Sequence, residues 1–224
     1  MNRTIGIVGG DLRITRLAEL LEKDGYIVQI CDKVEELAKD NDIIIIGAPN
    51  YAYDIPKNNN AKIIDIFKME ELSVLNAVPT AEGAIETAME ESEITLNGSN
   101  ILILGYGRIG KVLSKMLQGI GANVFCEARK EHDLAWIEAY GYQKVRLSDL
   151  DKELPKYDFI FNTIPYLMLD ETRLSRVKKD CIIIDLASKP GGVDFEKAKE
   201  IGIKAIPALR SSGQSCAAHS CEVH

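Results

Sequence analysis

The sequence predicts an α/β protein made of two doubly wound parallel-sheet domains, the second of them a Rossmann domain that binds NAD(P). Short apolar runs rich in β-branched residues alternate with helical patterns along almost the whole chain, which is typical of strand–helix–strand repetition. Residues 43–46 and 182–184 are apolar at every position, as in parallel strands whose sheet is covered on both faces. The alternation also restarts once, so we expect two sheets.

Four strands are expected before the restart and six after it. In order, they cover residues 5–8, 26–30, 42–46 and 62–66, then 100–104, 122–126, 143–146, 157–161, 181–185 and 203–206. Between the two sets, an apolar stripe at helical spacing predicts a linking helix, with Pro79 and Glu82 in its first turn. We therefore place an N-terminal domain at 1–95, the Rossmann domain at 96–209 and an aberrant tail at 210–224.

The composition is that of an ordinary globular chain and excludes several function classes. The net charge of -7 argues against a general nucleic-acid binder, which shows a basic face. No apolar run reaches the roughly 18–20 residues that span a bilayer, and a strand pattern directly after Met1 predicts no signal peptide. Five scattered cysteines do not form a disulfide framework. We expect a reduced, cytoplasmic protein with no membrane or nucleic-acid partner.

The strongest motif is Gly105-x-Gly107-x-x-Gly110, which follows an apolar strand and opens an amphipathic helix. This is the context of a dinucleotide-binding loop. The first glycine permits a tight turn, the second lets the backbone approach the pyrophosphate, and the third lets helix and strand pack closely. The helix N-terminus then offers amide donors to phosphate. The expected cofactor contacts are Gly105, Tyr106, Gly107, Arg108, Ile109 and Gly110.

Charged residues at the end of the following strand bear on the choice of cofactor. An acid there, Glu127, would bind a ribose 2′-hydroxyl and select NAD. Arg129 and Lys130 would instead bind a 2′-phosphate, arginine being the better fork for it. We favour NADP with NAD as the alternative, and a solvated charge cluster is the third interpretation.

Polar residues follow further strands at the edge where open α/β sheets bind ligands. Those expected to face the cofactor are Asn162, Thr163, Ile164, Pro165 and Ala187, and Ser188 is expected to face the substrate. After the first strand, Gly10, Asp11 and Arg13 form a substrate-facing turn, or else Asp11 caps the next helix.

Histidines and tail cysteines offer a weaker signal. His132 opens a helix, and we interpret it either as a surface histidine or as a general base. Cys216, His219, Cys221 and His224 resemble a metal ligand set. A single residue separates the two Cys/His pairs, and no following element frames them, so we expect no structural metal.

Beyond these motifs, the chain resembles the A subunits of dipicolinate synthase. The resemblance rests on Val8-Gly9-Gly10-Asp11, Asn76-Ala77-Val78-Pro79-Thr80-Ala81-Glu82-Gly83-Ala84-Ile85, the glycine loop, Ala128-Arg129, Asn162-Thr163-Ile164-Pro165 and Asp185-Leu186-Ala187-Ser188-Lys189-Pro190-Gly191-Gly192. It is strongest from about residue 74 to 209. The resemblance implies oxidation of dihydrodipicolinate to dipicolinate with NAD(P) during sporulation, beside a flavoprotein B subunit.

The resemblance also suggests where the substrate binds. Its carboxylates would lie near Pro79 and accept hydrogen bonds from Thr80, Arg13, Ser188 and backbone amides near Gly83 and Gly191, while Lys189 would pair with one of them. Glu82 and Asp185 are candidates for the base, and proton loss to water is the alternative. A homo-oligomer is left open.

Two departures from that family concern the C-terminal end. The family's chains are longer, and a one-base frame slip could convert their continuing segment into residues 210–224, so we interpret the chain as C-terminally truncated. Two other functions stay open: an NAD(P)-dependent dehydrogenase of the 2-hydroxyacid type, which needs a histidine paired with an acid, and a non-catalytic nucleotide-binding subunit.

Overall fold

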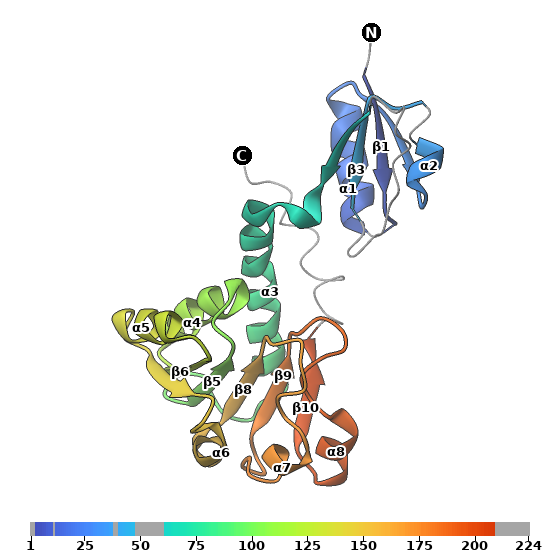
Figure 1. Cartoon of the computed structure of the whole chain (residues 1–224). Helices are drawn as coiled ribbons and strands as arrows, with labels where there is room; N and C mark the ends of the chain where they lie inside the picture. Colours follow the sequence, from blue (N-terminus) through green and yellow to red (C-terminus); the bar gives the residue numbers. More distant parts are fainter. Residues whose placement is uncertain (1–2, 11, 38–39, 48–60, 209–224) are drawn as a thin grey trace. The chain divides into compact units, whose positions relative to one another are not determined.

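The computed structural model of the chain describes residues 3–10, 12–37, 40–47 and 61–208. These residues form two compact units, which divide between Leu75 and Asn76. We call them the N-terminal unit and the C-terminal unit and describe each by itself (Figure 1). The tail with its Cys/His cluster lies outside the described residues.

The N-terminal unit is a four-stranded parallel sheet with the order β2-β1-β3-β4. Its elements are β1 (Thr4–Val8), α1 (Leu12–Lys23), β2 (Ile27–Cys31), α2 (Val34–Leu37), β3 (Ile43–Ile46), β4 (Lys62–Asp65) and the short η1 (Ile66–Lys68). Ile14 and Ala18 of α1 pack on one face of the sheet, and Val34 and Leu37 of α2 pack on the other. The sheet is therefore covered on both faces.

The C-terminal unit is a six-stranded parallel sheet with the order β10-β9-β8-β5-β6-β7. Its strands are β5 (Asn100–Leu104), β6 (Asn123–Ala128), β7 (Gln143–Arg146), β8 (Phe159–Asn162), β9 (Ile182–Asp185) and β10 (Lys204–Pro207). The chain order reverses between β5 and β8, which is the switch point at which Rossmann sheets bind dinucleotides.

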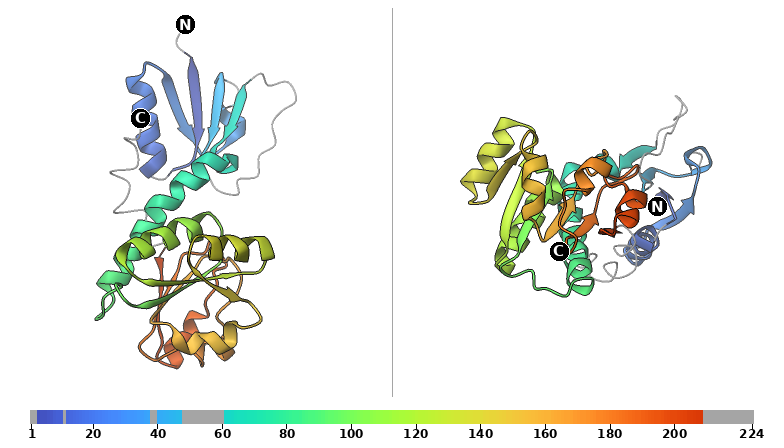
Figure 2. Two further views of the ribbon diagram at one scale, coloured as in Figure 1. Left: turned by 90° about the vertical axis from the view of Figure 1, so that its left-hand side faces the viewer. Right: turned by 90° about the horizontal axis from the view of Figure 1, so that it is seen from below.

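Helices cover both faces of this sheet and enclose its two cores (Figure 2). On one face lie the C-terminal part of α3 (Glu70–Glu90), α4 (Arg108–Ile120) and α5 (Glu131–Ala139). On the other lie α6 (Leu150–Glu153), η2 (Leu154–Lys156), α7 (Glu171–Leu174) and α8 (Phe195–Glu200). The α/β class and all ten predicted strands are confirmed, each within two residues of its expected ends.

Helix α3 differs from the prediction at its start. It begins at Glu70, so Pro79 lies inside the helix and not in its first turn. An internal proline costs about 3 kcal/mol in helix stability, but the following turns bury Ala81, Ala84 and Ala88 against the sheet. Glu70 and Glu71 are the acids of the first turn. The division at Leu75 and Asn76 also assigns most of α3 to the C-terminal unit, whereas the sequence places the boundary after residue 95.

Candidate functional site

The glycine loop between β5 and α4 has the geometry that a dinucleotide requires. Gly105 has a φ of +92°, and a Cβ there would lie 2.6 Å from Thr163 Oγ1. A Cβ at Gly110 would lie 2.2 Å from the Gly105 carbonyl oxygen, so the start of α4 packs directly on the end of β5. A Cβ at Gly107 would meet no atom within 4 Å. Only the middle glycine therefore faces open space, which is the space that a pyrophosphate would need.

Helix α4 begins directly at this open glycine. Gly107 is its N-cap and provides no side chain to cap the first turn. The N-terminus of a helix carries a partial positive charge and amide groups that point outward, so it attracts phosphate. The loop therefore fits the pyrophosphate of a nicotinamide dinucleotide.

The loop after β8 lies against the glycine loop. The Thr163 amide donates to the Leu104 carbonyl at 3.0 Å, and the Thr163 hydroxyl donates to the same oxygen at 2.9 Å. Because β5 and β8 are neighbours in the sheet, their following loops meet at the switch point. The structure thus brings two of the predicted residues, Thr163 and Ile164, beside Gly105, where an added Cβ would lie 2.6 Å and 2.8 Å from their side chains. Asn162 and Pro165 are their neighbours in the chain.

The loop after β9 joins the same cluster through a buried carboxylate. Asp185 is 3% exposed. Its Oδ1 accepts hydrogen bonds from Asn162 Nδ2 at 2.8 Å and from the Ala187 amide at 3.1 Å, and its Oδ2 accepts from the Gly192 amide at 3.0 Å. Asp185 therefore connects β8 to both ends of the loop from Ala187 to Gly192, and the exposed residues Ser188 and Lys189 extend from this loop.

Gly192 is a site residue that the sequence analysis missed. A Cβ there would lie 2.1 Å from Asn162 Nδ2 and 2.7 Å from the Ile164 carbonyl oxygen. Only a glycine lets the loop after β9 approach the loop after β8 so closely. The available signal was the Gly191-Gly192 pair that follows a strand ending in aspartate.

Glu127 and Arg129 occupy different environments at the end of β6. Glu127 is 2% exposed, and burial raises the pKa of its carboxyl, partly offset by the Gly105 amide, Arg129 and Arg173. Strand alternation turns Glu127 to the same face as Phe125, away from Cys126 and Ala128, which pack on the α4 side. Arg129 and Lys130 are exposed, and Lys130 is the N-cap of α5.

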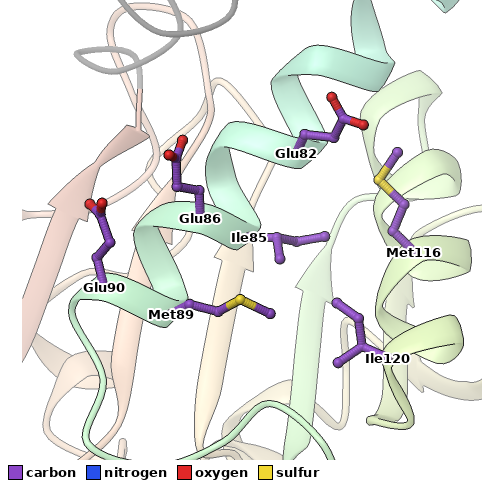
Figure 3. Close-up of a pocket in the computed structure, with 7 residues that line it drawn as sticks. All are labelled: Glu82, Ile85, Glu86, Met89, Glu90, Met116 and Ile120. Atoms are coloured by element: carbon purple, nitrogen blue, oxygen red, sulfur yellow. The ribbon is translucent and has the colours of Figure 1, made fainter.

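Helix α3 places the predicted substrate residue Glu82 beside α4 and away from the glycine loop. Glu82 lines a groove of about 520 Å³ between α3 and α4 (Figure 3). The groove's other lining residues are Ile85, Glu86, Met89, Glu90, Met116 and Ile120. Met116 lies nine residues after Gly107 (116 − 107), which is roughly 13 Å along a helix axis. Glu82 thus lies beside the third turn of α4.

Two groups of α3 that were expected to bind a substrate carboxylate form hydrogen bonds within the helix. Gly83 is an interior residue of α3, and the amides of a helix interior bond to carbonyls one turn earlier. The expectation that amides near Gly83 bind substrate is therefore wrong. The Thr80 hydroxyl donates to the Asn76 carbonyl at 2.7 Å, so as a donor it is already used within the helix.

The structure describes two of the three substrate residues predicted in the N-terminal unit. Gly10 and Arg13 are exposed in the N-terminal unit, while Asp11 lies outside the described residues. His132 is exposed at the start of α5, with Nε2 at 3.2 Å from Asp133 Oδ1. It follows β6, on the opposite side of β5 from β8.

The described part of the chain contains no helix that is long and apolar enough to cross a membrane.

Comparisons with known proteins find relatives in sequence and in fold. The A subunit of dipicolinate synthase from Bacillus subtilis is 35% identical over 74% of this chain, and the match spans 56% of that relative's length. The crystal structure of the same Bacillus subtilis protein is 25% identical, with a TM-score of 0.77 over 97% of this chain and 94% of that one. The crystal structure of the Bacillus halodurans counterpart is 24% identical, with a TM-score of 0.74 over 96% and 95%.

A family model covers more than half of the chain. Residues 75–193 match the family described as "D-isomer specific 2-hydroxyacid dehydrogenase, NAD binding domain". This range contains the glycine loop and the Asn162 and Asp185 loops, and the family is an oxidoreductase family that uses a nicotinamide cofactor. The chain therefore belongs to the family of NAD-binding domains of D-isomer specific 2-hydroxyacid dehydrogenases.

Proposed function

We propose that this chain oxidises dihydrodipicolinate to dipicolinate with NADP, as the A component of a dipicolinate synthase in sporulating cells. The similarity to the A subunit of that enzyme supports the substrate. The observation that carries the proposal is the meeting of three loops, after β5, β8 and β9, at the switch point of the C-terminal sheet. By the same similarity, the partner is the flavoprotein B subunit, and the site of action is the cytoplasm.

The proposed cofactor contacts follow the three loops and the end of β6. The backbone from Gly105 to Gly110 receives the pyrophosphate, and Asn162, Thr163, Ile164, Pro165 and Ala187 face the nicotinamide. When bound, the nicotinamide supplies the hydride acceptor for the reaction. The chain contributes orientation, since Asp185 fixes the loop from which Ser188 and Lys189 extend toward solvent.

The proposed reaction removes two hydrogens from the dihydropyridine ring. One ring carbon loses a hydride to the cofactor, another ring position loses a proton, and the electron pair left behind completes the aromatic ring. Lys189 pairs with one substrate carboxylate, and the Ser188 hydroxyl donates to it. Aromatisation is downhill, so orientation of the two rings is the main requirement.

The geometry disfavours both carboxylates that the sequence offered as a base. Both oxygens of Asp185 already accept hydrogen bonds, and a group that must take up a proton needs a lone pair directed at the substrate. Glu82 lies beside the third turn of α4, and so is not at the loops that are proposed to face the nicotinamide. We therefore propose that the ring proton leaves to water and that Asp185 is a positioning residue.

The environments at the end of β6 favour NADP over NAD. The buried Glu127 carboxyl has a raised pKa, which disfavours the charged acceptor that a ribose hydroxyl would need. Arg129 is exposed and forms no salt bridge with another described residue. Its guanidinium is a planar fork that matches a phosphate, so we propose that Arg129 binds the 2′-phosphate.

The test is NADPH formation from dihydrodipicolinate, measured with and without the flavoprotein partner. The expected result is NADPH production that Gly107→Val abolishes, because a branched side chain fills the pyrophosphate space without backbone strain. Cofactor binding without turnover, even with the partner present, would contradict the proposal and leave a non-catalytic nucleotide-binding role.

Family membership favours one second candidate, a 2-hydroxyacid dehydrogenase. Such an enzyme needs a histidine paired with an acid near the nicotinamide, whereas the described pair His132–Asp133 follows β6, on the opposite side of β5 from the loops after β8 and β9. Reduction of 2-oxoacids by NADH or NADPH, lost in His132→Asn, would support this candidate over the first.

A further inference from the structure

A second pocket of the C-terminal unit lies on the face that α3, α4 and α5 cover, between α4 and the end of α5. Its volume is about 380 Å³, within the range of roughly 300–1,000 Å³ that small-molecule sites occupy. It is lined by Tyr106, Lys111, Lys115, Gln118, Tyr140 and Tyr142. None of these residues except Tyr106 has been placed at the dinucleotide site.

The walls of this pocket are a connected row of aromatic rings. The centroids of Tyr106 and Tyr142 lie 6.4 Å apart, edge to face, and those of Tyr140 and Tyr142 also lie 6.4 Å apart. Trp136 stacks on Tyr140 at 5.5 Å with an interplanar angle of 21°. Trp136 and Tyr140 are 52% and 56% exposed. Exposed, mutually stacked rings offer flat surfaces to another planar group.

The charged groups that line the pocket are both positive. Lys111 and Lys115 lie one turn apart on α4, and neither forms a salt bridge among the described residues. Lys111 Nζ lies 5.7 Å from the centre of the Tyr106 ring. The three acids of α5 each have a cationic or imidazole partner: Glu131 with Arg146, Asp133 with His132 and Glu138 with Lys144. Two ammonium groups are thus available to an anion.

The tyrosine hydroxyls add donors to these charges. Burial raises the pKa of Tyr106 and of Tyr142, so both hydroxyls keep their protons at neutral pH. A site with flat aromatic walls, two ammonium groups and protonated phenols suits a flat ligand with two negative groups.

We propose that the α4–α5 pocket binds a small planar aromatic dicarboxylate. The ring stacks on the tyrosine wall, one carboxylate pairs with Lys111 and the other with Lys115. The pocket is distinct from the dinucleotide site, because Lys115 and Gln118 lie in the third and fourth turns of α4. Tyr140 and Tyr142 follow the last residue of α5, at the far end from Lys130. The site does not depend on the proposed oxidation.

The test uses the fluorescence of Trp136, which is the one tryptophan of the chain and stacks on the pocket wall. The full chain is titrated, without any dinucleotide, with dipicolinate, with isophthalate (a benzene ring in place of the pyridine), with a cyclohexane dicarboxylate and with inorganic phosphate. Excitation is at the red edge of the indole band, where the dicarboxylates are transparent. The variants are Lys111→Gln and Lys115→Gln, with Lys199→Gln on the exposed side of α8 as the matched control.

The expected result is a saturable change with both aromatic dicarboxylates and a weaker one with the cyclohexane acid. Each pocket variant should weaken binding about tenfold, the size of one charge-assisted contact at a partly exposed site, and Lys199→Gln should leave it unchanged. Equal binding of phosphate, or equal loss in all three variants, would overturn the proposal, as would the absence of a saturable signal. NADPH formation is not part of this readout, so a failed oxidation assay and a failed titration stay distinguishable.

Discussion

The carboxylate of Asp185 shows how much one residue contributes to this site. It accepts one hydrogen bond from the Asn162 side chain and two from the backbone amides of Ala187 and Gly192, at the two ends of the loop after β9. The sequence placed an aspartate at the end of an apolar strand and so predicted its position. It could not predict its partners, because Asn162 and Gly192 meet Asp185 only once β8 and β9 are neighbours. This is why Asp185 was open as a base candidate before the structure was known.

Asp185→Asn should destabilise the C-terminal unit by roughly 2–4 kcal/mol. The new amide group would face an N–H group, and leaving a buried donor without an acceptor costs about 1–3 kcal/mol for each group. Urea denaturation followed by Trp136 fluorescence measures the loss. Asp170→Asn is the control, since Asp170 caps α7 through one bond to the Arg173 amide. Asparagine caps helices as well as aspartate does, so this variant should cost less than about 0.5 kcal/mol. Equal losses of stability in the two variants would show that the hydrogen bonds of Asp185 contribute no more than those of a helix cap.

Arg129→Ala should weaken the binding of NADP far more than that of NAD. A charge-assisted bond to the 2′-phosphate contributes about 1.5–3 kcal/mol, so the dissociation constant for NADP should rise roughly tenfold to a hundredfold. Isothermal titration with both cofactors provides the measurement. Arg176→Ala, at an exposed arginine that follows α7, is the matched control and should change neither affinity. An equal loss for both cofactors would mean that Arg129 acts through the loop and not on the phosphate.

Glu127→Gln should stabilise the fold near neutral pH. The pKa of Glu127 is raised above its ordinary value of 4.5, so the folded state holds this proton over a range in which the unfolded state has lost it. Folding stability therefore falls as pH rises from about 4.5 through the folded pKa, and is constant above it. Because glutamine does not titrate, Glu127→Gln removes this pH-dependent loss of folding stability. Thermal melts from pH 4 to 8 should show a flatter profile than wild type, and an unchanged slope would contradict the assignment.

Among the elements, α3 is the one that the sequence described least well. Proline is common in a first helical turn, so Pro79 indicated a helix start, yet the helix begins nine residues earlier at Glu70. The local rule was overridden because the turns after Pro79 bury alanines in the larger core. The strands were predictable because their apolar runs are local properties of the chain. The position of Glu82 was not, since it depends on how α3 packs against α4.

Pro79→Ala should stabilise α3. Proline has no N–H, so residue 79 cannot donate to the Leu75 carbonyl, and replacement by alanine removes a cost of up to about 3 kcal/mol. We expect an increase of about 1–3 kcal/mol in the free energy of unfolding, measured by urea denaturation. Val78→Ala, at the adjacent exposed position, should change it by less than about 0.5 kcal/mol. A loss of stability in Pro79→Ala would show that the ring makes packing contacts that outweigh the missing bond.

At the scale of the whole molecule, the two-sheet organisation followed from the restart in the strand pattern. The Rossmann class of the second sheet followed from the glycine loop in its strand–helix context. The division of the chain was harder to place, because it falls within a continuous helix where composition does not change. Leu75 and Asn76 are successive residues of α3. A domain boundary is normally sought in a loop, so the sequence did not indicate this position.

The two units should unfold in separate steps. The N-terminal unit has four strands and smaller buried clusters than the C-terminal unit, and compact units generally unfold as units. Trp136 reports on the C-terminal unit alone, whereas far-UV circular dichroism reports on both. The dichroism signal should begin to change at lower urea than the fluorescence, and NADP should shift only the fluorescence transition upward. Coincident transitions that shift together would show that the units are coupled.

Tyr106 is part of both the glycine loop and the α4–α5 pocket. Its backbone lies between Gly105 and Gly107 in the dinucleotide loop, while its ring is 6% exposed and packs beside Tyr142 and Lys111. A molecule that shifts this ring therefore perturbs the loop backbone, and a dinucleotide that orders the loop restrains the ring. Thermodynamic reciprocity makes the two effects equal: the factor by which a pocket ligand changes dinucleotide affinity is the factor by which the dinucleotide changes affinity for that ligand. If the α4–α5 pocket binds its proposed ligand, Tyr106 is the residue shared by the two sites, and any coupling between them would appear as equal changes in the two affinities.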